Sequence, residues 1–297
     1  MDLRKYFWEK LSQSPVLTPK SLNLTQHLEE KRGEKIYIGQ RASNITDDID
    51  LVVYTAAIHE DNPEFACAKE KGIPMITRAE LLGQIMKNYR LPIAVAGTHG
   101  KTTTTSMISH VLLEAEADPT ISVGGILPAI HGNIRVGNSE TFITEACEYT
   151  NSFLSFFPKI SIILNIDADH LDFFKDIDDI RHSFRLFAER LPKDGTLIIN
   201  QDIPNVAEIT KDLPCGIISY ALDRMQITLL QILNLMKLHT LPSIVWKKVL
   251  YLVIFHFPFL AFTMSQMHCL PLHWEENLVF PWNLSRKVSC ILEEQTA

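Results

Sequence analysis

The chain has 297 residues, of which 46% are apolar and 21% are charged, and its net charge is −7. That length suits about two domains, and that balance is typical of a globular chain able to bury a core. The acidic charge argues against a nucleic-acid partner, and no polybasic segment indicates a membrane surface.

Composition changes along the chain and divides it into zones. All 12 glycines lie between Gly33 and Gly216, and no aspartate follows Asp223. We therefore expect an atypical leader at 1–20, a regularly patterned body at 21–225 and an atypical tail at 226–297. The five scattered cysteines include no C-x-x-C pair, so neither a zinc site nor a disulfide framework is indicated, and a cytoplasmic location is expected.

The first part of the body, residues 21–90, alternates short apolar runs with helical patterns. Strands are expected at 35–39, 50–58 and 73–77, and helices at 62–72 and 78–89. Such alternation is typical of an α/β unit with a parallel sheet.

The second part, residues 91–225, repeats this alternation on a larger scale. The predicted strands are 93–97, 120–125, 141–147, 160–166, 195–200 and 216–222. A helix is expected from about Thr102, and another at 176–192, where apolar residues recur every three or four positions. The sequence thus predicts an α/β fold whose centre is a parallel-sheet domain.

The stretch "AVAGTHGKTTTT" at 94–105 joins a predicted strand to a predicted helix. It departs from the usual G-x-x-x-x-G-K-[ST] loop, because Val95 stands at the first glycine position. Glycines and a helix N-terminus can still direct N–H groups at phosphates, while Lys101 reaches the β- and γ-phosphates and Thr102 binds Mg²⁺. We therefore expect ATP phosphates to be bound by Gly97, Thr98, His99, Gly100, Lys101, Thr102 and Thr103.

Acidic residues and a histidine follow two other predicted strands. Glu145 lies near the end of one and Glu148 just after it, and His170 follows the other among three aspartates. Because the carboxyl ends of parallel strands share one edge of the sheet, these groups are expected to face the phosphate loop. Hydroxyl and carboxylate oxygens suit Mg²⁺, so Thr102 and Glu145 are a sensible ligand pair. His170 alone would be read as a loop or capping histidine, but beside this loop we count it as a metal ligand.

Three motifs, "GTHGKTTT", "EACEYTNSFL" and "NIDADHLD", together resemble the Mur ligases of bacterial cell-wall synthesis over about residues 22–225. His99 resembles the alanine-adding members, although the muropeptide-recycling ligase shares this histidine. The resemblance implies that ATP activates the carboxylate of UDP-N-acetylmuramate as an acyl phosphate, which the amine of L-alanine then attacks. It also implies Lys101, Glu145 and His170 as catalytic residues, with Thr102 and Glu145 on one Mg²⁺, His170 on a second, and Glu148 in support.

Both ends of the chain depart from the resemblance. The leader lacks the G-x-G-G-x-G turn expected of the first domain, and the tail lacks the P-G-x-H-N stretch and third domain. Three interpretations of the tail stay open: a membrane segment at 249–264, an appended domain, or translation out of the ancestral frame, which we favour. Alternatives to an active ligase are a non-catalytic nucleotide-binding remnant, the recycling ligase, or a folylpolyglutamate synthetase.

Overall fold

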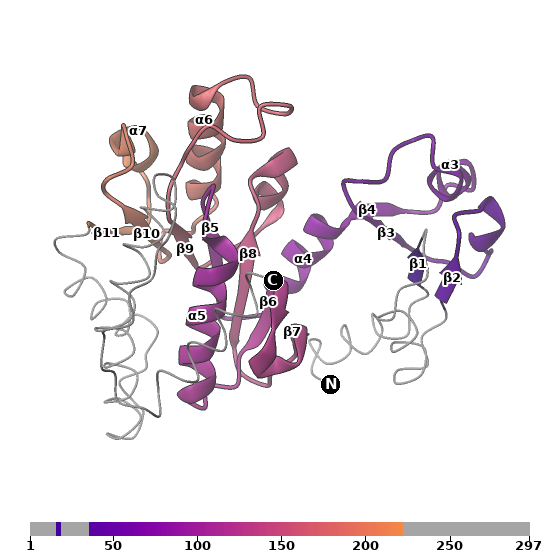
Figure 1. Cartoon of the computed structure of the whole chain (residues 1–297), viewed down its shortest axis with the longest axis horizontal. Helices are drawn as coiled ribbons and strands as arrows, with labels where there is room; N and C mark the ends of the chain where they lie inside the picture. The colour runs from indigo at the N-terminus through magenta and orange to yellow at the C-terminus, as the bar shows by residue number, and fades with distance from the viewer. Residues whose placement is uncertain (1–15, 19–35, 222–297) are drawn as a thin grey trace, which may run out of the picture.

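The computed structural model describes residues 16–18 and 36–221. Figure 1 shows a large sheet with helices on both faces, next to a smaller N-terminal unit that carries α3 and leads into α4. The predicted leader at 1–20, apart from residues 16–18, and the whole predicted tail at 226–297 lie outside the described residues. The proposed membrane segment at 249–264 falls there too, and no helix among the described residues is long and apolar enough to cross a membrane.

The large sheet has seven strands in the order β11-β10-β9-β5-β8-β6-β7. Its strands are β5 (Leu91–Ala96), β6 (Thr120–Leu127), β7 (Gly132–Arg135), β8 (Thr141–Ala146), β9 (Ile160–Ile163), β10 (Thr196–Asn200) and β11 (Gly216–Tyr220). All neighbours are parallel except β6 and β7. The parallel α/β prediction is thus confirmed, with an antiparallel edge strand that the sequence did not indicate.

Side chains of β5 alternate between two hydrophobic cores. Ile93 and Val95 belong to the core under α5 (Lys101–Glu114), whereas Ala94 and Ala96 belong to the core on the opposite face. A strand buried on both faces reads as a continuous apolar run, as this one does. Because β5 lies in the middle of the sheet, the loop that follows it emerges between β8 and β9.

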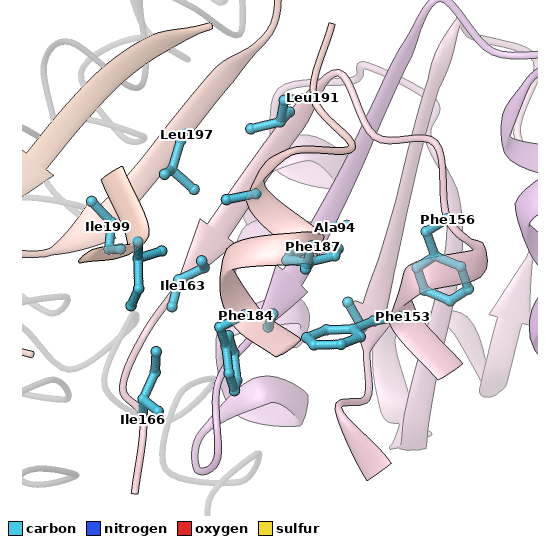
Figure 2. Packing of buried hydrophobic residues seen from close by; sticks show 14 of the residues in the cluster. Ala94, Phe153, Phe156, Ile163, Ile166, Phe184, Phe187, Leu191, Leu197 and Ile199 are labelled. Carbon is cyan, nitrogen blue, oxygen red and sulfur yellow. The ribbon is translucent and has the colours of Figure 1, made fainter. Parts of the chain in front are cut away.

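The core opposite α5 is built around α6 (Ile177–Ala188), whose apolar face was predicted from the sequence. Phe184 and Phe187 are fully buried, and Phe187 stacks on Phe153 with 4.7 Å between ring centroids (Figure 2). Asp176 caps this helix by accepting hydrogen bonds from the backbone N–H groups of Asp178 and Asp179. Phe153 lies in η3 (Tyr149–Ser155), so the segment after β8 is anchored in this core.

The smaller unit contains two parallel strand pairs, β1 (Val16–Thr18) with β2 (Ile36–Ile38) and β3 (Val52–Tyr54) with β4 (Met75–Thr77). The strand expected at 50–58 is therefore shorter than predicted, and turns follow it. Helix α3 (Pro63–Glu70) begins with the predicted proline and is capped by Asn62, and α4 (Arg78–Met86) begins with a capping box from Thr77 and Glu80.

Helix α4 joins the smaller unit to the large sheet. A Cβ built on Gly83 would lie 2.0 Å from the backbone oxygen of Ser155 at the end of η3. Tyr89, just after α4, donates a hydrogen bond to the Thr120 hydroxyl, 3.0 Å away. The first contact fixes α4 against the segment that follows β8, and the second ties the end of α4 to the start of β6.

Short elements that the sequence did not predict complete the described chain. They are η1 (Ala42–Asn44), η2 (Pro128–Ile130) and α7 (Val206–Thr210). All are shorter than two helical turns, so they carry too few residues to show a helical hydrophobic period.

Candidate functional site

The loop between β5 and α5 depends on its two glycines. Gly97 has φ of 146° and Gly100 has φ of 85°, conformations that other residues rarely adopt. A Cβ on Gly97 would also lie 3.0 Å from Cβ of Leu164 and 3.2 Å from the backbone nitrogen of Asn165. Gly100 occupies the N-cap of α5 and has no side chain that could cap it. The first N–H groups of α5 are therefore free of a capping side chain, which is the arrangement that binds phosphate.

The same loop is attached to the segment that follows β9. Asn165 accepts the His99 N–H through Oδ1 at 2.8 Å and donates from Nδ2 to the His99 oxygen at 3.0 Å. The Thr98 hydroxyl accepts the Asp167 N–H at 2.9 Å. Sequence reasoning missed Asn165, although it opens the "NIDADHLD" motif and is the first polar residue after an apolar strand.

Lys101 folds back over the loop from the first turn of α5. Its ammonium donates to the backbone oxygens of Gly97 at 2.6 Å and Thr98 at 3.1 Å. It also donates to both carboxylate oxygens of Glu148, at 2.8 and 3.1 Å. The Glu148 side chain is only 2% exposed and that of Lys101 15%, so this ion pair is shielded from water.

Thr102 and Glu145, predicted as a ligand pair, are brought together. The Thr102 hydroxyl donates to Oε2 of Glu145 at 2.9 Å, and the Gly124 N–H donates to Oε1 at 2.5 Å. A Cβ on Gly124 would lie 2.9 Å from that carboxylate, so glycine makes room for it. Adjacent hydroxyl and carboxylate oxygens are ligands that Mg²⁺ prefers, and this pair therefore fits the predicted ion.

His170 lies on a different segment from that pair. Its φ is 53°, and its carbonyl accepts the N–H groups of Phe173 and Phe174. Its ring contacts Tyr149 at 4.7 Å between centroids, and Nε2 lies 3.9 Å from the Asp169 carboxylate. Within the described residues, no three His, Cys, Asp or Glu side chains form a metal cluster. The structure thus pairs Thr102 with Glu145 but does not add His170 to the same ligand set.

Two titratable side chains beside these groups have shifted pKa values. A hydrogen bond to the Asp172 carboxylate raises the pKa of Tyr149. Burial is the main cause that raises the pKa of the Cys147 thiol, although part of this residue is exposed, and the charge of Glu148 adds to the effect. Cys147 is therefore protonated at neutral pH and is a poor candidate for a nucleophile.

Comparisons with known proteins agree with these motifs. The family model described as "Mur ligase middle domain" matches residues 95–245, and the one described as "Mur ligase family, catalytic domain" matches residues 21–90. The chain is 67% identical over 204 residues to the UDP-N-acetylmuramate–L-alanine ligase of Agathobacter rectalis, covering 69% of this chain and 44% of that protein. It is 56% identical over 200 residues to the enzyme of the same name from Clostridium botulinum, covering 67% of this chain and 43% of that one.

Solved structures give the same picture. The UDP-N-acetylmuramate-alanine ligase of Thermotoga maritima superposes with a TM-score of 0.62 at 28% identity, covering 74% of this chain and 49% of that one. The UDP-N-acetylmuramate:L-alanyl-gamma-D-glutamyl-meso-diaminopimelate ligase of Neisseria meningitides superposes with a TM-score of 0.64 at 23% identity, covering 69% of each chain, which supports the fold alone. The chain spans less than half the length of the curated relatives it matches.

Proposed function

The chain belongs to the Mur ligase family, and on this premise we propose that it serves the ATP-dependent joining of L-alanine to UDP-N-acetylmuramate in peptidoglycan synthesis. Relatives up to 67% identical bear the name of that ligase. Because the chain covers 44% of that relative, the activity of the whole enzyme is a proposal for this chain. We place the reaction in the cytoplasm, where the nucleotide substrates are made.

The described side chains support the first half of this reaction. The loop from Gly97 to Thr103 would bind the triphosphate through backbone N–H groups and the N-terminus of α5. Thr102 and Glu145 would hold a magnesium ion, which supplies neutralising charge to the phosphates. Lys101 would neutralise the transferred phosphoryl group as the substrate carboxylate attacks it and ADP leaves.

The second half is attack of the alanine amine on the resulting acyl phosphate, with release of inorganic phosphate. We propose that His170, as a ligand of a second magnesium ion, orients the substrate carboxylate. Its segment is hydrogen-bonded to the phosphate loop through Asn165 and Asp167, which supports a role next to the nucleotide.

One observation carries the proposal above all others. The hydroxyl of Thr102 and the carboxylate of Glu145 lie 43 positions apart in the chain and yet 2.9 Å apart in space, directly beside the lysine-bearing turn. A core-packing role does not require a hydroxyl and a carboxylate at this place, whereas a bound magnesium-phosphate group does.

The test is alanine-dependent ADP release. The full chain is incubated with ATP, Mg²⁺ and UDP-N-acetylmuramate, with and without L-alanine, and ADP is followed by a coupled assay. We expect Lys101→Met and Glu145→Gln to lower kcat/KM by at least about 100-fold, as for other groups that stabilise transition-state charge. The matched control is Glu189→Gln, which replaces a carboxylate at the C-cap of α6 that pairs with Arg185 at the surface, and it should leave the rate unchanged.

A second candidate is a non-catalytic nucleotide-binding remnant, because the phosphate loop and the adjacent Thr102–Glu145 pair could bind a nucleotide without turnover. It predicts ATP binding without alanine-dependent turnover. In the same assay, a tripeptide in place of L-alanine tests for the recycling ligase. A folate with L-glutamate, in place of the muramate with L-alanine, tests for a folylpolyglutamate synthetase. The ligase function is contradicted if ADP is released neither with L-alanine and UDP-N-acetylmuramate nor with either of these replacements.

A further inference from the structure

We propose that Glu148 is a positioning residue that holds Lys101 in the nucleotide-free chain and competes with the triphosphate for its ammonium group. This inference deepens the proposed function, because it rests on Lys101 being the lysine that binds the phosphates. It assigns to Glu148 a control of nucleotide affinity in addition to any support of the metal site.

The ammonium of Lys101 is fully occupied. It has three N–H donors, and four oxygens surround it at 2.6 to 3.1 Å, two from loop carbonyls and two from Glu148. A phosphate oxygen can therefore be bound only if one of these acceptors is given up. The two carbonyls belong to Gly97 and Thr98 in the loop itself, so the lysine lies over the turn that would receive the anion.

Glu148 is the fixed member of the pair. It lies two residues after the end of β8, and its backbone oxygen accepts the Asn151 N–H at 2.9 Å within a turn where Thr150 and Asn151 both have positive φ. Phe153 lies two residues after this turn, within η3, and is fully buried in the core. The carboxylate is thus held by short, anchored backbone, whereas Lys101 reaches it through four methylene groups. When the pair separates, the lysine is the side chain that moves.

Burial makes the competition strong. The two charges of an ion pair that is shielded from water attract each other more strongly than those of an exposed pair, because less solvent screens them. The same shielding also leaves the negative charge of Glu148 poorly screened. It therefore repels the negative charge of any phosphate that Lys101 binds. Both effects lower the affinity for ATP, so removal of the negative charge at position 148 should raise it.

The decisive variant is Glu148→Gln, which keeps the shape and an acceptor oxygen but removes the charge. ATP binding to the full chain is measured by calorimetry in EDTA, so that metal binding does not contribute. We expect the dissociation constant to fall about tenfold relative to the unchanged chain, the size of one charge-assisted hydrogen bond. A loss of structure would weaken binding, so tighter binding is a result that a purely structural role does not produce.

The matched control is Glu60→Gln. Glu60 pairs with Lys69 at 2.8 Å, the same distance as the closer Glu148 contact, but both side chains are more than half exposed and lie on the smaller unit. This variant should leave ATP binding unchanged. Glu148→Asp keeps the charge but withdraws the carboxylate from Lys101, and we expect it to bind ATP more tightly than the unchanged chain and less tightly than Glu148→Gln. Far-UV circular dichroism confirms that each variant is folded.

The outcomes separate this inference from the proposed function. Equal or weaker ATP binding by folded Glu148→Gln, or no binding by any variant, overturns the inference. Tighter binding by Glu148→Gln supports it. If that tightening is seen while the unchanged chain releases no ADP in the presence of alanine, the competition stands and the ligase function fails.

Discussion

The contact between α4 and η3 gives the sharpest test of how the smaller unit is attached. In Gly83→Ala, the new methyl group would lie 2.0 Å from the backbone oxygen of Ser155, where ordinary contacts begin at 3.4 Å. Neither partner is a flexible side-chain end, so the helix and the η3 segment must separate by more than an ångström.

The expected cost follows from two opposing terms. Overpacking two backbone segments costs about 3 kcal/mol. Alanine in place of glycine inside a helix stabilises the helix by about 1 kcal/mol. The net loss of unfolding free energy is therefore about 2 kcal/mol, which lowers the urea midpoint by about 1 M at a typical slope.

The assay is equilibrium unfolding in urea followed by far-UV circular dichroism. The control is Gly132→Ala at the start of β7, where an added methyl group meets no atom within 4 Å. We expect this control to unfold at the midpoint of the unchanged chain. Midpoints for the two variants that agree within about 0.2 M would refute the close packing of α4 on η3.

Three further changes test the charges and the core. Lys101→Met should lower the unfolding free energy, measured in urea, by about 3 kcal/mol because it leaves the Glu148 carboxylate buried and unpaired. Adding Glu148→Gln to this variant should restore most of the lost stability, and a double variant as unstable as Lys101→Met would contradict the pairing. Hydrogen bonds from Arg135 and, to a lesser degree, from Asn138 lower the pKa of Asp118 from 3.8 to about 2. The side chains of Arg135 and Asp118 are about one third exposed. After solvent screening, this pair should therefore add about 1 kcal/mol of stability, which is present above about pH 4 and lost as the pH falls towards 2. The loss should disappear in Asp118→Asn when urea unfolding is repeated along that range. Ser161 Oγ is buried without a hydrogen-bond partner among the described residues, so Ser161→Ala should be neutral or stabilising by up to about 1 kcal/mol in thermal unfolding, and a clear loss would show a hidden partner.

The large sheet was predictable from the sequence because its strands are apolar runs bounded by turn residues. The run around Ile93 and the helix face around Phe184 are examples, and both are buried as expected. Strand β7 was missed, since its four residues Gly132–Arg135 are half polar and lie at an edge, where one face is solvated. The antiparallel direction of β7 depends on its pairing with β6, which no local pattern encodes.

The site was predictable in part for a similar reason. Lys101 and Thr102 begin a helix that follows a recognisable strand, and Glu145 lies at the end of another strand, so topology alone places them on one edge. The engagement of Glu148 with the lysine could not be predicted, because it depends on the left-handed turn at Thr150 and Asn151 and on the rotamer of a long side chain. The position of His170 relative to the metal pair likewise depends on a loop that no periodic pattern describes.

The hydrogen bonds between Asn165 and His99 have a consequence for the energetics of ligand capture. A free loop must lose backbone entropy when an anion orders it, at roughly 1 kcal/mol or more for each residue that becomes fixed. Here two amide hydrogen bonds and the Thr98–Asp167 contact order the turn while the protein folds. The phosphate loop is preorganised, so the free energy of each phosphate contact contributes to affinity and little of it is needed to order the loop.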